Sequence, residues 1–235
     1  MQAYFRHTST LSWSFLACIP LLILYESLIL ISQPGQETLI RLGADIWIKN
    51  LLWLIHEDTL LVTAGLAIAA GIAIYYAERK KDIVYKPSYF GWMVAESIFW
   101  AIVLAFGVAS VTGFFFGMIA APPEPTRLQM LALSIGAGLY EELIFRVVLV
   151  YALLQIFKLL FEYQTAAAFA VILAAAIFSW VHYIGTYGDV FTLSSFMFRM
   201  IFGLVLNALL VLRGFGITAW THSMYDVLLV VFFYP

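Results

Sequence analysis

The residues that could carry chemistry gather in three short stretches of the second half of the chain. Residues 140–146 read Tyr-Glu-Glu-Leu-Ile-Phe-Arg, residues 178–182 read Phe-Ser-Trp-Val-His, and residues 222–226 read His-Ser-Met-Tyr-Asp. Carboxylates and imidazoles take up and release protons near neutral pH, and together they can direct a water molecule at a peptide carbonyl. These residue types indicate acid–base chemistry if the fold brings the three stretches together.

Helical spacing gives the first stretch two distinct faces. Glu142 and Arg146 are four residues apart, so on an α-helix they lie on one face and can pair. Glu141 is rotated by about 100° from Glu142, which leaves its carboxylate pointing elsewhere. A structural ion pair with a second glutamate facing water is the alternative interpretation.

The histidines extend this pattern to two more helices. His222 and Asp226 are again four residues apart, whereas His182 belongs to a different hydrophobic stretch. A lone histidine inside a membrane is more often a packing residue than a catalyst. Two histidines with several carboxylates on three separate spans instead predict one polar site built from facing helices.

The composition places these residues in a lipid bilayer. Hydrophobic residues make up 64% of the 235 residues and charged residues 11%, against about 45–50% and 25% in a soluble domain. With 12 basic and 14 acidic residues, the chain has no excess of positive charge that would attract nucleic acid. The single cysteine, Cys18, excludes an internal disulfide and a cysteine-rich metal site.

The hydrophobic stretches predict an all-α, polytopic transmembrane helix bundle of about seven spans, with a range of six to eight. Residues 37–56 carry charges at four-residue spacing among Leu, Ile and Trp, which favours an interfacial amphipathic helix over a short eighth span. We expect one integral-membrane domain, 1–235, with N-terminal spans in 1–120 and the working helices in 128–235. The predicted spans are 11–32, 59–77, 90–120, 128–156, 165–184, 191–213 and 215–234.

Positive charges orient this bundle, because lysine and arginine favour cytoplasmic loops. With the N-terminus inside, seven basic residues fall in inner segments and three in outer ones, while Arg146 and Arg199 lie within spans. We therefore expect a cytoplasmic N-terminus and an external C-terminus. The inner residues are Arg6, Arg79, Lys80, Lys81, Lys86, Lys158 and Arg213, and the outer ones are Arg41, Lys49 and Arg127.

The ordered motifs Glu-Glu-x-x-x-Arg (141–146), Phe-x-x-x-His (178–182) and His-x-x-x-Asp (222–226) resemble the CAAX protease and bacteriocin-processing family, also called CPBP or Abi. That family includes the type II CaaX prenyl endopeptidase and bacterial relatives. The resemblance covers roughly residues 128–235. It implies a glutamate-dependent intramembrane protease, a hydrolase that needs no cofactor and cuts a membrane-associated protein or peptide, and we expect a prokaryotic inner-membrane protein.

The resemblance also implies roles for single residues. Glu141 would be the general base that activates water, and His182 would help to hold that water. Glu142 and Arg146 match the rest of the first motif, where we expect an orienting role.

The third motif would stabilise the tetrahedral oxyanion through His222 and Asp226. CaaX prenyl endopeptidases usually carry asparagine where this sequence has Asp226. An ionised aspartate would repel an oxyanion, so Asp226 could help only when protonated or by orienting His222.

Counting residues from the inner ends of the predicted spans places the three motifs at different depths in the membrane. Glu141 comes out about 22 Å deep, His182 about 26 Å and His222 about 10 Å. The three can meet if helices 128–163 and 165–184 project together into the cytoplasm. On that basis we expect the cut near the cytoplasmic face.

Three other functions are compatible with parts of the sequence. Glu, His and Asp could bind a divalent metal such as zinc, although no His-Glu-x-x-His is present. A non-catalytic scaffold or immunity protein would also fit the membrane fold. A transporter could use Glu26, Glu96 and Arg199, but we expect structural partners for these three charges.

Overall fold

The computed structural model describes residues 2–36, 39–112, 125–185 and 188–234, and it confirms the helical bundle. Every regular element in these ranges is a helix. Six of the helices are long and apolar enough to cross a membrane. Helices are the expected spanning element because they satisfy every backbone polar group within one segment, where lipid offers no hydrogen bonds.

The helices follow the predicted hydrophobic stretches closely. The spanning candidates are α2 (Leu11–Ser32), α4 (Thr59–Glu78), α5 (Pro87–Thr112), α8 (Tyr163–Val181), α9 (Leu193–Arg213) and α10 (Phe215–Phe233). The predicted span 128–156 is divided into α6 (Arg127–Gly136), η1 (Ala137–Leu149) and α7 (Val150–Phe157). The remaining helices are α1 (Gln2–Thr8) and α3 (Gly43–Trp53), and residues 113–120 of the predicted third span lie outside the described residues.

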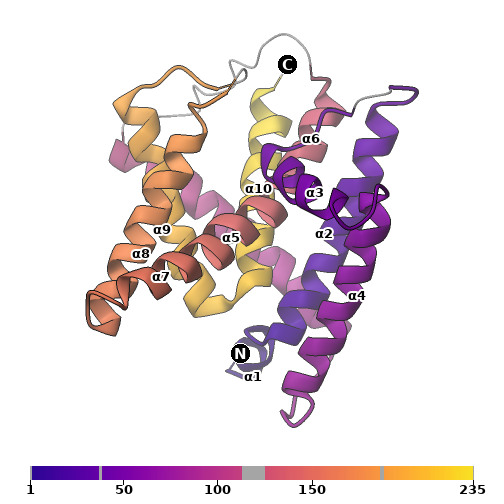
Figure 1. The fold of residues 1–235 in the computed structure, drawn as a ribbon, viewed down its shortest axis with the longest axis vertical. Coiled ribbons are helices and arrows are strands. Elements are labelled where there is room, and N and C mark those ends of the chain that lie inside the picture. The colour runs from indigo at the N-terminus through magenta and orange to yellow at the C-terminus, as the bar shows by residue number, and fades with distance from the viewer. Residues whose placement is uncertain (1, 37–38, 113–124, 186–187, 235) are drawn as a thin grey trace.

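The two termini lie at opposite ends of the bundle (Figure 1). Helices α2, α5, α8 and α10 run away from the N-terminal end, and α4, α6 and α9 run back toward it. Helix α7 turns aside and crosses the bundle obliquely, so counting residues along this span overestimates the depth of Glu141 (Figure 1). This difference removes part of the depth mismatch found from the sequence.

The amphipathic segment forms α3, but its charged face is directed into the protein. Asp45 and Lys49 are buried, and Glu26 of α2 accepts hydrogen bonds from Lys49 Nζ (2.7 Å) and from Arg41 (3.0 Å). Tyr25 donates to Asp45 at 2.7 Å. The apolar face of α3 is left exposed, so this helix is attached by buried ion pairs rather than by its hydrophobic side.

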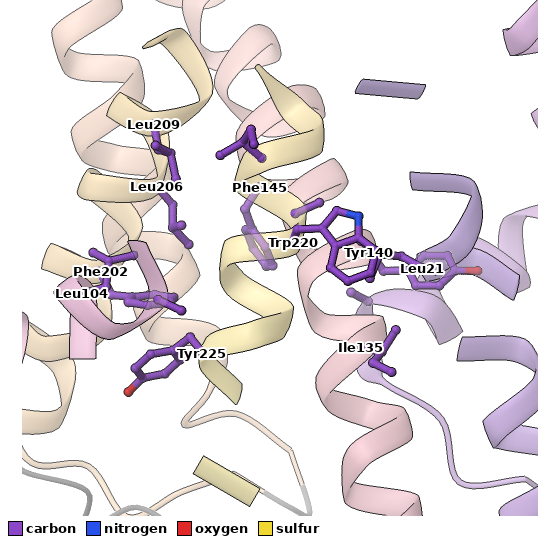
Figure 2. Close-up of a cluster of buried hydrophobic side chains, with 14 of the residues drawn as sticks. Leu21, Leu104, Ile135, Tyr140, Phe145, Phe202, Leu206, Leu209, Trp220 and Tyr225 are labelled. Carbon is purple, nitrogen blue, oxygen red and sulfur yellow. The ribbon is translucent and has the colours of Figure 1, made fainter. Parts of the chain in front are cut away.

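The core lies between the helices of the second half and α2 and α5. Figure 2 shows Phe202, Leu206 and Leu209 along α9, with Tyr225 of α10 near Phe202. Trp220 lies on the other side of α10, toward Tyr140 and Leu21 (Figure 2). Helices α9 and α10 are joined by the single residue Gly214, whose φ of +85° lies in the left-handed region that favours glycine. The tight turn holds α9 and α10 side by side.

The remaining intramembrane charges have partners, as predicted. Glu96 of α5 accepts two hydrogen bonds from Arg213, at 2.6 and 2.9 Å, and one from Tyr4 at 2.6 Å. Arg199 forms an ion pair with Asp189. Together with the pairing of Glu26, these contacts give each of the three charges an ion-pair partner.

Candidate active site

The first motif lies on a widened helix. Residues Ala137–Leu149 form a π-helix, with hydrogen bonds from residue i to i+5 in place of i to i+4. Such segments are rare and are frequently found at functional sites. The sequence predicted an α-helix here, and spacing alone carries no sign of the change.

Gly138 allows this helix to pack directly on α10. A Cβ atom at Gly138 would overlap the backbone carbonyl oxygen of Ala219 and Oγ of Ser223. Ser223 also donates a hydrogen bond to the carbonyl of Ile135 at 3.1 Å. The missing side chain therefore brings the backbones of η1 and α10 into contact, and the first and third motifs with them.

The predicted pair of Glu142 and Arg146 is confirmed. Nε of Arg146 lies 3.2 Å from Oε2 of Glu142, and both side chains are buried. Among the described residues, however, none of the three guanidinium nitrogens finds a well-directed hydrogen-bond acceptor. The guanidinium carbon instead lies 3.9 Å from the ring centroid of Phe178, so charge and a cation–π contact hold Arg146 in place.

Glu142 also contacts the histidine of the third motif. Its Oε1 lies 2.6 Å from Nδ1 of His222. The opposite ring nitrogen, Nε2, lies 3.5 Å from Oδ2 of Asp226 and 4.0 Å from Oε2 of Glu141. His222 thus connects the two glutamates of the first motif, one through each ring nitrogen.

The second motif approaches from the end of α8. His182 is the C-terminal cap of this helix, and its Nδ1 lies 2.8 Å from the carbonyl oxygen of Phe178. Since a carbonyl can only accept, Nδ1 carries a proton, and in the neutral ring Nε2 is an acceptor. The backbone N–H of Asp189 donates to the carbonyl of His182 at 2.9 Å, which fastens the following loop to the same residue.

The three motifs meet in a cavity of about 260 Å³. Glu141, His182, His222 and Asp226 all line it, as the sequence predicted, and most of the other lining residues are apolar. Glu142 and Arg146 contact this group without being lining residues. The full lining consists of Leu42, Met130, Leu133, Ser134, Ala137, Glu141, Phe178, His182, Phe198, Arg199, Phe202, His222, Tyr225, Asp226, Leu229 and Val230.

Arg199 is a cavity residue that sequence reasoning treated as structural only. It is the one lysine or arginine among the described residues that line the cavity. Its guanidinium also donates to the hydroxyls of Tyr183 (2.8 Å) and Ser195 (2.6 Å) and pairs with Asp189. The sequence signal for a functional role was an arginine inside a predicted span. Nothing in the residue spacing predicted its contact with Asp189.

The side chains around the cavity are of types that carry out acid–base chemistry. Within the described part of the chain, no group of three His, Cys, Asp or Glu residues has the geometry to hold a metal ion. Glu141, His182 and His222 all line the cavity, in which a water molecule and a peptide carbonyl could bind. This arrangement can polarise water on one side and receive a negative oxygen on the other.

The comparisons with known proteins agree with the motifs. Residues 123–228 match the family model described as type II CAAX prenyl endopeptidase Rce1-like. All three motifs lie inside this segment. No curated protein and no solved structure matches the chain.

Proposed function

Because residues 123–228 match the family model described as type II CAAX prenyl endopeptidase Rce1-like, we propose that the protein is an intramembrane endopeptidase that uses water activated by Glu141. Its substrate is a membrane-associated protein or peptide. The observation that carries the proposal is that the two glutamates have different positions. Glu141 lines the cavity, whereas Glu142 lies outside the lining and contacts Nδ1 of His222.

In the proposed reaction, the Glu141 carboxylate takes one proton from a water molecule, and the water oxygen forms a bond to the carbonyl carbon of the substrate. His182 accepts the second hydrogen of that water at Nε2 and so sets its direction. The carbonyl oxygen becomes an oxyanion. When this intermediate collapses, the C–N bond breaks and the proton held by Glu141 passes to the leaving amine, so no covalent enzyme intermediate is required.

His222 is the proposed oxyanion donor. Because Nδ1 donates to Glu142, Nε2 carries a proton only in the imidazolium form, in which both nitrogens donate. A donor aimed at the developing oxyanion contributes about 2.7–4 kcal/mol to catalysis in a well-studied protease. Asp226, at 3.5 Å from Nε2, orients this nitrogen toward the cavity.

The experiment compares the termini of membrane proteins in host cells that lack the gene and carry either wild type or Glu141→Gln. Glu57→Gln, which changes an exposed glutamate in a loop, is the matched control. We expect new termini with wild type and Glu57→Gln and none with Glu141→Gln. Identical termini in all strains, with a phenotype that Glu141→Gln still rescues, would instead establish a non-catalytic scaffold or immunity protein.

We propose catalysis without a metal cofactor, and chelation tests this point separately. Activity of the purified protein should survive prolonged treatment with EDTA and 1,10-phenanthroline. Loss of activity that one metal restores would establish the zinc-type alternative. The paired states of Glu26, Glu96 and Arg199 disfavour the transporter alternative, because a conducted ion needs charges that are free to exchange partners.

A further inference from the structure

The cavity extends from the catalytic groups toward one end of the bundle only. On α10, which runs away from the N-terminal end, its lining begins at His222 and continues to Val230. On the span that runs in the opposite direction, the lining begins at Met130 and stops at Glu141. The rest of the lining comes from the end of α8, from the first half of α9 and from the residue before α3, and α3 lies in the half of the bundle nearer the C-terminus (Figure 1). These residues are Phe178, His182, Phe198, Arg199, Phe202 and Leu42. Along the bundle, the described lining residues thus lie level with His222 and Glu141 or closer to the end at which the C-terminus lies.

The basic residues gather at the other end. Residues 79–86, which join α4 to α5, contain four lysines or arginines, and all four are exposed. Arg6 on α1, Lys158 after α7 and Arg213 at the end of α9 lie at the same end. This end carries seven basic residues, of which six are exposed, while Arg213 is buried and pairs with Glu96.

The cavity end carries few basic residues, and most of these are neutralised. Arg41 and Lys49 both pair with Glu26 and Asp45 inside the protein. Only Arg127 remains exposed on this side among the described residues outside the spans. The loop 182–192, which follows the second motif, has no lysine or arginine in its sequence.

From these two distributions we propose that the active-site cavity faces the non-cytoplasmic side of the membrane. Short loops rich in lysine and arginine stay in the cytoplasm, so the end that carries residues 79–86 is cytoplasmic and the cavity end is not. The predictions of a cytoplasmic N-terminus and of a cut near the cytoplasmic face cannot both hold in this fold. The charge distribution favours the first of them.

This inference rests on the proposed function and specifies its substrate class. The substrate is a membrane-associated protein whose scissile segment is exposed on the external or luminal side, or descends into the membrane from that side. A segment confined to the cytoplasm would meet the bundle at the end away from the described cavity lining.

Cysteine labelling in sealed, right-side-out vesicles tests the proposal in the full chain. The starting variant is Cys18→Ser, because Cys18 is the only native cysteine. Glu57→Cys marks the loop before α4 at the cavity end, Lys80→Cys marks the opposite end, and Met130→Cys marks the cavity lining. A membrane-impermeant maleimide should label positions 57 and 130 in intact vesicles and position 80 only after permeabilisation.

The reverse result would overturn the proposal: labelling of Lys80→Cys in intact vesicles, with Glu57→Cys protected. A Met130→Cys variant that reacts from neither side, or only from the side of Lys80→Cys, would overturn it as well. Each cysteine variant is also assayed for cleavage that depends on Glu141. Reversed labelling with intact cleavage would refute the orientation alone, whereas the expected labelling without any such cleavage would refute the proposed function alone.

Discussion

Oε1 of Glu142 lies 2.6 Å from Nδ1 of His222, across the contact between η1 and α10. This hydrogen bond fixes the rotation of the imidazole and directs Nε2 toward Asp226 and Glu141. A carboxylate that holds one nitrogen of a histidine while the other faces the reacting atoms is a recurrent arrangement in hydrolases. In the proposed mechanism, the second glutamate of the motif therefore orients the oxyanion donor.

Replacing Glu142 by glutamine tests this role. The amide keeps the shape of the side chain but removes the charge beside His222, and its NH₂ group can select the wrong ring tautomer. We expect kcat to fall by about 10²-fold with KM nearly unchanged, as for a lost oxyanion donor. Steady-state kinetics on the purified variant would measure both constants, and wild-type kcat would exclude the role.

We predict that Arg146 contributes mainly to stability. Arg146→Met should cost about 3–5 kcal/mol, because it removes the guanidinium partner of the buried Glu142 carboxylate. Lys81→Met is the control, since it breaks an ion pair with Glu78 in which the lysine is exposed, and it should cost less than about 1 kcal/mol.

Unfolding in detergent would compare the two variants. The double variant Glu142→Gln/Arg146→Met should lose less than the sum of the two single losses, because no unpaired charge remains. Equal losses for Arg146→Met and Lys81→Met would contradict a buried, coupled pair.

Asp226→Asn tests whether Asp226 acts through hydrogen bonding, which an amide can replace, or through its negative charge. If Asp226 donates to the oxyanion or orients His222, an amide can do both, so activity should stay within about tenfold of wild type. Asp226→Leu keeps the approximate volume without either function and should lose about 10²–10³-fold, the usual effect of a missing oxyanion contact. If both variants were equally inactive, a negative charge at this position would be required.

The close approach at Gly138 gives a prediction about geometry. Gly138→Ala places a methyl group against Ala219 and Ser223, so η1 and α10 must separate. We expect loss of cleavage together with reduced thermal stability. Gly65→Ala, in α4, where a Cβ atom meets no neighbour, is the matched control and should leave both unchanged. An active, stable Gly138→Ala protein would show that the contact is not needed.

The sequence predicted elements and motifs better than contacts. A continuous apolar stretch bounded by helix breakers marks where a spanning helix begins and ends, which explains why α2 matches the predicted 11–32. The four-residue spacing also correctly paired Glu142 with Arg146 and His222 with Asp226. These relationships depend on neighbouring turns of one helix and can be read from spacing alone.

Contacts between helices could not be predicted in this way. The bond between Glu142 and His222 depends on the packing of two distant segments, and the inward charged face of α3 depends on Glu26 of another helix. The depth count failed for a similar reason, because it assumed straight spans where α7 turns aside (Figure 1). Tertiary packing, rather than local preference, decides each of these features.

The most direct measurement of the central claim is the rate of peptide cleavage by purified wild type and Glu141→Gln in proteoliposomes, with a peptide that spans a cut mapped in cells. We predict that the substitution lowers kcat by at least about 10²-fold, the lower range of a general base's contribution, while the protein unfolds at the wild-type temperature. Cleavage by Glu141→Gln at the wild-type rate would contradict water activation by Glu141.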